Sequence, residues 1–329
     1  MRVLGKTNLK VNEIGLGGIP IQGTNKQIVK SMIKTMCDEG VNFIDTARGY
    51  TNSEELLGEG IKGVREKFIL ATKSMSRTYE GMKQDIETSL EKLQTSYIDL
   101  YQMHNVQLMD DIKGAYEALE EAKQQGKVKH IGLTTHSVEV LQREVVLNRF
   151  ETLQFPYNII ESQGEVLFEE ANKKNIGIIV MKPLAGGALD DADLALKYIL
   201  NNKNISVVIP GMESVEQILQ NNSVKAGGIT DEEALKVEKI RKELKNDFCR
   251  RCGYCQPCPV GINIPLVFLC EGYYVRYGLE DWAKSRYNSM KVKPNECINC
   301  GRCEGKCPYK LNIREKIKKI ANLMEGTHE

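Results

Sequence analysis

Eight of the ten cysteines lie in two short runs near the carboxyl end of the chain, at gaps of two or three residues. The first run contains Cys249, Cys252, Cys255 and Cys258, and the second contains Cys297, Cys300, Cys303 and Cys307. Three thiolates spaced by two residues can surround one 4Fe-4S cluster, because they fall around a single turn of chain. The fourth cysteine of each run precedes a proline, as in bacterial iron–sulfur runs. The spacing therefore predicts two 4Fe-4S clusters.

The fourth cysteine of such a run ligates the cluster of the other run. This rule predicts one cluster on Cys249, Cys252, Cys255 and Cys307, and a second on Cys297, Cys300, Cys303 and Cys258. The first run is one residue shorter than the second before its fourth cysteine. A structural zinc site is the alternative, although zinc usually takes two cysteine pairs separated by a longer loop. Basic residues among the ligands would raise the reduction potential of an anionic cluster.

A second set of reactive side chains lies in the first third of the chain: Asp45, Tyr50, Lys73 and His104. A lysine beside a tyrosine favours the phenolate, and a carboxylate on the lysine fixes its position and charge. Tyr50 could then donate a proton to a carbonyl oxygen, which the imidazole of His104 would orient by a hydrogen bond. This chemistry suits hydride addition to a carbonyl group.

These four residues lie at or just after the ends of predicted strands. Short β-branched runs alternate with segments of helical period over residues 1–225, which predicts β-α units and a parallel sheet. The predicted strands span residues 14–18, 42–47, 68–73, 98–104, 130–135, 152–157, 176–184 and 206–210. Eight is the number of strands in a closed (β/α)8 TIM barrel, whose active site lies at the carboxyl ends of the strands.

Beyond the barrel the composition changes to cysteine, proline and short helices. We expect a barrel over residues 1–240 and a small, mostly α-helical, ferredoxin-like iron–sulfur domain over residues 241–329. A charged helix that begins after Thr230 would connect them.

The start of the chain contains two further patterns. The sequence of residues 3–11 predicts a small hairpin at the bottom of the barrel. Gly15, Gly17 and Gly18 lack the spacing of a dinucleotide fingerprint, so we interpret them as strand packing.

The charge balance excludes a strong global field, because 45 basic residues face 44 acidic ones. We expect small-molecule or protein partners rather than nucleic acid or a membrane. No signal peptide or membrane-spanning run is recognisable, and cysteines at metal-ligand spacing suit a reducing compartment, so we expect a cytoplasmic protein. Cys37 and Cys270 lie in apolar surroundings and are interpreted as packing residues.

Residues 1 to about 225 resemble the aldo/keto reductase superfamily. The resemblance rests on residues 42–58, which include Asp45 and Tyr50, on 71–73, which end at Lys73, and on 99–104, which end at His104. It implies that these four residues are catalytic in a carbonyl reductase or alcohol dehydrogenase that uses NADP(H) or NAD(H). With the cysteine runs, the chain resembles the branch of that family with a C-terminal ferredoxin-type domain.

The resemblance also implies residues that hold the cofactor. They are Thr134, Thr135, Gln154, Pro183, Leu184, Gly186, Pro210, Gly211, Met212, Gln217 and Asn221. Several positions depart from the family pattern: Thr135 replaces an asparagine, and Met181 replaces an aromatic ring. Gly211 and Gln217 stand where a lysine and an arginine usually contact the 2′-phosphate, so the choice among NADP, NAD and a flavin stays open.

Three functions remain open at this stage. The first is nicotinamide-dependent carbonyl chemistry in the barrel. The second is an electron-transfer module in which FMN mediates between hydride and single electrons, with a ferredoxin or a larger redox enzyme as partner. In the third, the clusters only stabilise a small domain that has little hydrophobic core.

Overall fold

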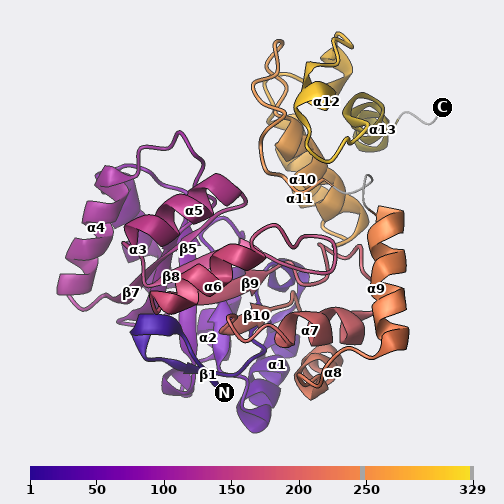
Figure 1. Ribbon diagram of the computed structural model, residues 1–329. Helices are drawn as coiled ribbons and strands as arrows, with labels where there is room; N and C mark the ends of the chain where they lie inside the picture. The colour runs from indigo at the N-terminus through magenta and orange to yellow at the C-terminus, as the bar shows by residue number, and fades with distance from the viewer. Residues whose placement is uncertain (245–248, 327–329) are drawn as a thin grey trace. The chain divides into compact units, whose positions relative to one another are not determined.

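The computed structural model describes residues 1–244 and 249–326, which fall into two compact units (Figure 1). The first contains residues 1–185 and 189–229, and the second contains residues 186–188 and the chain from Thr230 onward. The boundary that we expected near residue 240 falls within helix α9 (Asp231–Leu244).

The first unit is the predicted (β/α)8 barrel. Within the described residues, eight parallel strands form one sheet in the order in which they occur along the chain. They are β3 (Leu16–Gly17), β4 (Phe43–Asp45), β5 (Ile69–Ser74), β6 (Ile98–Met103), β7 (Val128–Thr134), β8 (Thr152–Pro156), β9 (Gly177–Met181) and β10 (Val207–Ile209). All eight predicted strands are confirmed, but the extension of the seventh to residue 184 is wrong. The strand ends at Met181 because Lys182 turns to a positive φ of 55°.

The barrel closes where its first and last strands meet. Parallel bridges join Ile14 to Val208 and Gly17 to Gly211, and the Gly17 N–H donates to the Pro210 carbonyl at 2.8 Å. A Cβ atom on Gly17 would lie 2.7 Å from the Ile209 carbonyl oxygen. A glycine is therefore required here by strand packing, as the sequence indicated.

The barrel interior has apolar layers below a polar one. Along β4 and β5, Phe43, Ile69 and Ala71 point into a common interior cluster, while Ile44 and Leu70 pack outward against the helices. This alternation is the period of two that β-strands impose. The hairpin of β1 (Arg2–Val3) and β2 (Lys10–Val11) contributes Leu4 and Val11 to the same interior cluster. The hairpin is confirmed.

Helices surround the strands, as Figure 1 shows for the unit coloured from indigo to orange. They are α1 (Lys26–Glu39), α2 (Ser53–Gly60), α3 (Tyr79–Lys92), α4 (Lys113–Gln124), α5 (Val138–Leu147), α6 (Glu165–Lys173), α7 (Ala192–Leu200) and α8 (Val215–Ser223). Asn25 caps the start of α1, where its side chain accepts from two backbone N–H groups, and Gly40, with a φ of 68°, caps its end. Such caps satisfy the unpaired backbone groups at helix ends.

The second unit is mostly helical. After α9 it contains α10 (Ile264–Val275), α11 (Glu280–Asn288), α12 (Arg302–Lys306) and α13 (Ile313–Glu325). As predicted, Thr230 caps α9: its hydroxyl accepts from the Glu233 N–H, and the Glu233 carboxylate accepts from the Thr230 N–H. None of the helices in the described ranges combines the length and the apolar character needed to span a bilayer.

We predict that Gly17→Ala lowers the free energy of unfolding of the barrel by about 2 kcal/mol, because the added methyl group overlaps the backbone of β10. Urea denaturation followed by circular dichroism measures the change. Gly227→Ala is the control, because a Cβ there would meet nothing within 4 Å. An equal effect of the two substitutions would contradict this account of barrel closure.

Candidate active site and cysteine cavities

The four side chains predicted to do chemistry lie at one end of the barrel. Asp45 ends β4 and Tyr50 follows in its loop, Lys73 is the penultimate residue of β5, and His104 comes directly after β6. Because parallel strands end at the same rim, these positions lie at the mouth of the barrel. Asp45 and Lys73 are buried, whereas Tyr50 and His104 are half-buried.

Asp45 and Lys73 form an ion pair inside the barrel. The Lys73 ammonium donates to Asp45 Oδ2 at 2.5 Å and to the Thr46 carbonyl oxygen at 2.7 Å. Their side chains are only 4% and 1% exposed. Burial raises the pKa of the Asp45 carboxyl and lowers the pKa of Lys73, while the attraction between the two charges opposes both shifts.

Tyr50 lies between the lysine and the imidazole. Lys73 Nζ is 4.9 Å from the centroid of the Tyr50 ring, which is within range of a cation–π interaction. The His104 ring meets the Tyr50 ring edge to face, with centroids 5.9 Å apart. The structure thus brings all four residues into one group.

Gln102 belongs to this group, although the sequence analysis did not single it out. The Gln102 amide donates to Asp45 Oδ1 at 3.2 Å and to Gln154 Oε1 at 2.9 Å. Asp45, Gln102 and Gln154 come from β4, β6 and β8, and side chains from alternate strands form one layer of such a barrel. Alternation along β6 from the inward Leu100 was the signal that could have found Gln102.

Arg77 is a second residue that sequence reasoning missed. Its guanidinium donates to the carbonyl oxygens of His104 at 2.8 Å and Asn105 at 3.2 Å, and pairs with Asp110 at 2.8 Å. Asn105 has a positive φ of 54°, so the chain turns sharply after His104. Arg77 fixes this turn and with it the position of the imidazole.

The residues implied to hold a nicotinamide lie at several strand ends. Thr134 accepts from the Asn105 N–H at 2.7 Å, and Thr135 donates to the Val106 carbonyl at 2.8 Å. Gln154 is buried and bound to Gln102. These three side chains therefore lie beside the loop that carries His104 or beside the Asp45 pair.

The remaining implied residues lie in the loops after β9 and β10 and in helix α8. Pro183 is buried and Leu184 half-buried after β9, while Gly186 clusters with the second unit, in which Arg276 donates to its carbonyl at 2.8 Å. After β10, Pro210, Gly211 and Met212 lie in the loop, and Gln217 and Asn221 lie in α8. Of these, Met212 packs in the core around the barrel, and Gln217 accepts from the Glu213 N–H at 2.7 Å.

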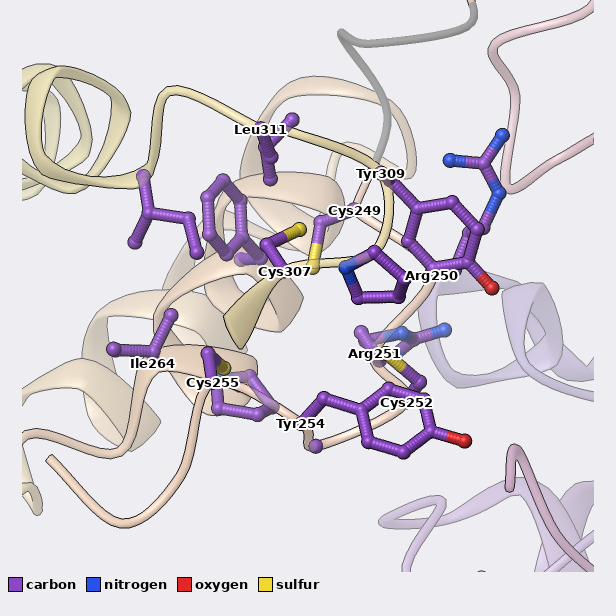
Figure 2. Close-up of a pocket in the computed structure, with 15 residues that line it drawn as sticks. Cys249, Arg250, Arg251, Cys252, Tyr254, Cys255, Ile264, Cys307, Tyr309 and Leu311 are labelled. Carbon is purple, nitrogen blue, oxygen red and sulfur yellow. The ribbon is translucent and has the colours of Figure 1, made fainter. Parts of the chain in front are cut away.

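In the second unit, the cysteines surround two separate cavities. Cys249, Cys252, Cys255 and Cys307 line the first, which we call site I (Figure 2). Apolar side chains such as Phe268 complete its wall. Arg250 is 5% exposed, and its guanidinium lies 3.9 Å from the centroid of Tyr309, which also lines the cavity.

The other cavity, site II, is lined by Cys258, Cys297, Cys300 and Cys303. Each site thus draws three cysteines from one run and one from the other, which is the arrangement that the spacing predicts. Arg314 also lines site II, where it donates to the Asn299 carbonyl at 3.1 Å and pairs with Glu304 at 2.7 Å. In the described ranges, no three His, Cys, Asp or Glu side chains converge as they would around a single metal ion.

Burial raises the pKa of the Cys255 thiol to about 12, and the neighbouring cysteines of both runs add to this shift. Thiolates crowded into a largely apolar cavity need positive charge to offset their repulsion. Iron supplies that charge when it binds, because a coordinating thiol is deprotonated. The donor set and the apolar walls of both sites therefore fit iron–sulfur clusters.

Comparison with known proteins identifies both parts of the chain. Residues 13–194 match the profile of the aldo/keto reductase family, and residues 248–312 match that of a 4Fe-4S dicluster domain. The chain belongs to the aldo/keto reductase family and is an oxidoreductase that carries a C-terminal 4Fe-4S domain.

Several relatives match the barrel over almost their full length. The oxidoreductase YqkF of Bacillus subtilis is 25% identical over 75% of this chain and 97% of its own. L-galactose dehydrogenase of Arabidopsis thaliana is 28% identical over 75% of this chain and 95% of its own. Among solved structures, the holo form of aldo-keto reductase AKR11C1 from Bacillus halodurans has a TM-score of 0.66 and 27% identity, over 73% of this chain and 95% of its own.

We predict that Lys73→Met lowers the free energy of unfolding by about 3 kcal/mol, because it leaves the Asp45 carboxylate buried without its counter-charge. The double variant Lys73→Met/Asp45→Leu should recover most of this loss, since neither charge then remains. Urea denaturation of both variants measures the effect. Lys67→Met, at an exposed lysine, is the control. A double variant no more stable than Lys73→Met would show that the pair does not act as one unit.

Proposed function

We propose that the barrel catalyses hydride transfer between a nicotinamide cofactor and a small carbonyl or alcohol substrate. The observation that carries this proposal is the position of Tyr50, between the buried Lys73–Asp45 pair and the His104 ring. Membership of the aldo/keto reductase family supports the same chemistry.

Tyr50 is the proposed proton donor to the substrate oxygen. The nearby Lys73 charge stabilises the phenolate left after proton transfer, and so makes the phenol a stronger acid. Asp45 holds Lys73 in place and balances its charge inside the barrel. His104 offers a ring nitrogen that can orient the substrate oxygen beside Tyr50.

When bound, the nicotinamide supplies the hydride. Thr134, Thr135 and Gln154 carry hydroxyl and amide groups suited to its carboxamide, and Gln154 is joined through Gln102 to Asp45. For the phosphates we propose Pro210, Gly211 and Met212 in the loop after β10, together with Gln217 and Asn221 of α8. This loop leads into α8, and neither Gly211 nor Gln217 supplies a charge for a 2′-phosphate.

We further propose that site I and site II each hold one 4Fe-4S cluster, which carries single electrons. Two separate cavities, each lined by four cysteines, support this assignment. The buried Arg250 places a positive charge at site I, which favours the reduced form of an anionic cluster. Because such clusters need reduced thiolates, we expect the protein to act in the cytoplasm.

We predict that Tyr50→Phe lowers turnover at least about 100-fold, because the variant has no proton to donate. The assay follows NADPH and NADH oxidation with 4-nitrobenzaldehyde as the probe substrate, in protein purified without oxygen. Iron content and visible absorbance should equal those of the unaltered protein.

Tyr97→Phe is the matched control for this substitution. Tyr97 is also half-buried, but it precedes β6 and so lies at the opposite end of the barrel from His104. The Tyr97→Phe substitution should leave turnover unchanged. Full activity of Tyr50→Phe would exclude Tyr50 as the proton donor.

We predict about eight iron and eight sulfide atoms per chain in protein purified without oxygen, as two 4Fe-4S clusters require. Cys252→Ala/Cys307→Ala removes two ligands from site I alone, so about half of the iron should be lost and the other half should stay. Cys252→Ala/Cys258→Ala takes one ligand from each site and should perturb both.

Metal analysis and electron paramagnetic resonance distinguish the two double variants. Loss of only one cluster in Cys252→Ala/Cys258→Ala would show that each run holds its own cluster. Stoichiometric zinc in place of iron would overturn the cluster assignment.

A further inference from the structure

The two cysteine sites differ in their access to the protein surface. Of the eight cysteines that line them, all in the described part of the chain, only Cys300 of site II is exposed. Its neighbours Ile298 and Asn299 are exposed as well, with 62% of the Ile298 surface accessible. At site I, Tyr254 is exposed, but Arg250 is buried and all four cysteines are only partly exposed. Site II is therefore the site with a cysteine fully accessible at the surface of the second unit.

The surface beside Cys300 is basic. Arg302 and Lys306 are both exposed and lie four residues apart on α12, so they share one helix face. The acidic residue between them, Glu304, is paired with Arg314 at 2.7 Å. Among the described residues, no ion pair neutralises Arg302 or Lys306, although Lys306 donates to the Gln256 carbonyl at 3.3 Å. The positive charge on this face is therefore available to a partner.

The excess of positive charge extends through the part of the second unit that carries the cysteines. Residues 249–326 contain fourteen lysines and arginines but seven aspartates and glutamates, whereas the full chain is balanced at 45 to 44. Charge of one sign concentrated on one unit attracts a partner of the opposite sign and speeds its diffusional encounter.

We propose that Ile298, Cys300, Arg302 and Lys306 form the docking surface for a small acidic protein that carries single electrons. Ile298 supplies an apolar centre and the two cations supply a charged rim, which is how protein interfaces are commonly arranged. One electron passes from the reduced carrier to site II, so the carrier is oxidised, the cluster is reduced, and no bond forms or breaks. This inference rests on the proposed cluster at site II.

The test uses the full chain with its clusters, and iron is counted before each measurement. The probe is a purified acidic two-cluster bacterial ferredoxin. Its affinity is measured by isothermal titration calorimetry without oxygen, at low and at high ionic strength. The rate of electron transfer is measured by stopped-flow spectroscopy. Low iron in the unaltered chain would refute the cluster assignment itself, whereas normal iron without binding would refute only the docking surface.

We predict that Arg302→Glu/Lys306→Glu weakens ferredoxin binding at least about tenfold at low ionic strength and slows the bimolecular rate in proportion. High salt should weaken binding to the unaltered chain, because the attraction is screened. Ile298→Ala should weaken binding at both ionic strengths, since it removes apolar contact and no charge. If the double variant loses iron, Arg302→Gln/Lys306→Gln replaces it, with a smaller loss of affinity in the same direction.

Lys30→Glu/Lys62→Glu is the matched control. It changes the net charge equally, but at exposed lysines of the barrel unit. Affinity and rate should stay close to those of the unaltered chain. An equal loss in both double variants would show that only net charge matters, and that result, or the absence of binding at low ionic strength, would overturn the proposal.

Discussion

The buried ion pair of Lys73 and Asp45 constrains how the strands of the barrel are arranged. Lys73 and Asp45 stay charged together in the interior only because each neutralises the other and because Thr46 and Gln102 take up further hydrogen-bonding capacity. Below them the interior cluster is apolar. The pair therefore needs strands β4, β5 and β6 in their observed register, and that register also brings Tyr50 and His104 together at the mouth.

The barrel could be predicted well because the sequence contains two clear periodicities, the period of two of strands and the helical period. Alternation along β4 and β5 and helical spacing along α1 and α4 each reflect a buried face, and local pattern alone is sufficient to show them. The four site residues were predicted for the same reason, as each lies at or near a strand end. What the sequence could not show were contacts between distant segments. Gln102 reaches Gln154, and Arg77 reaches the turn after His104, only once the barrel is closed.

The loop after β9 illustrates a different limit. Its apolar run continues past Met181, so the pattern predicted strand as far as residue 184, yet Lys182 turns the backbone to a positive φ. A hydrophobic run predicts that its residues are buried, but it does not predict their backbone conformation. Pro183 is indeed buried. In the second unit, ligand spacing was more informative than any periodicity. Cys307 lines the same cavity as the first run. The spacing of paired iron–sulfur runs predicts this grouping, because the fourth cysteine of each run ligates the cluster of the other.

Each cysteine site is made from both ends of the segment between the two runs, which includes α10 and α11. Two occupied sites would thus act as a double cross-link around that segment, restricting the unfolded chain much as disulfides do in secreted domains. Oxygen dismantles exposed clusters, so oxidative damage at the accessible Cys300 edge would release one cross-link and loosen the segment as a whole.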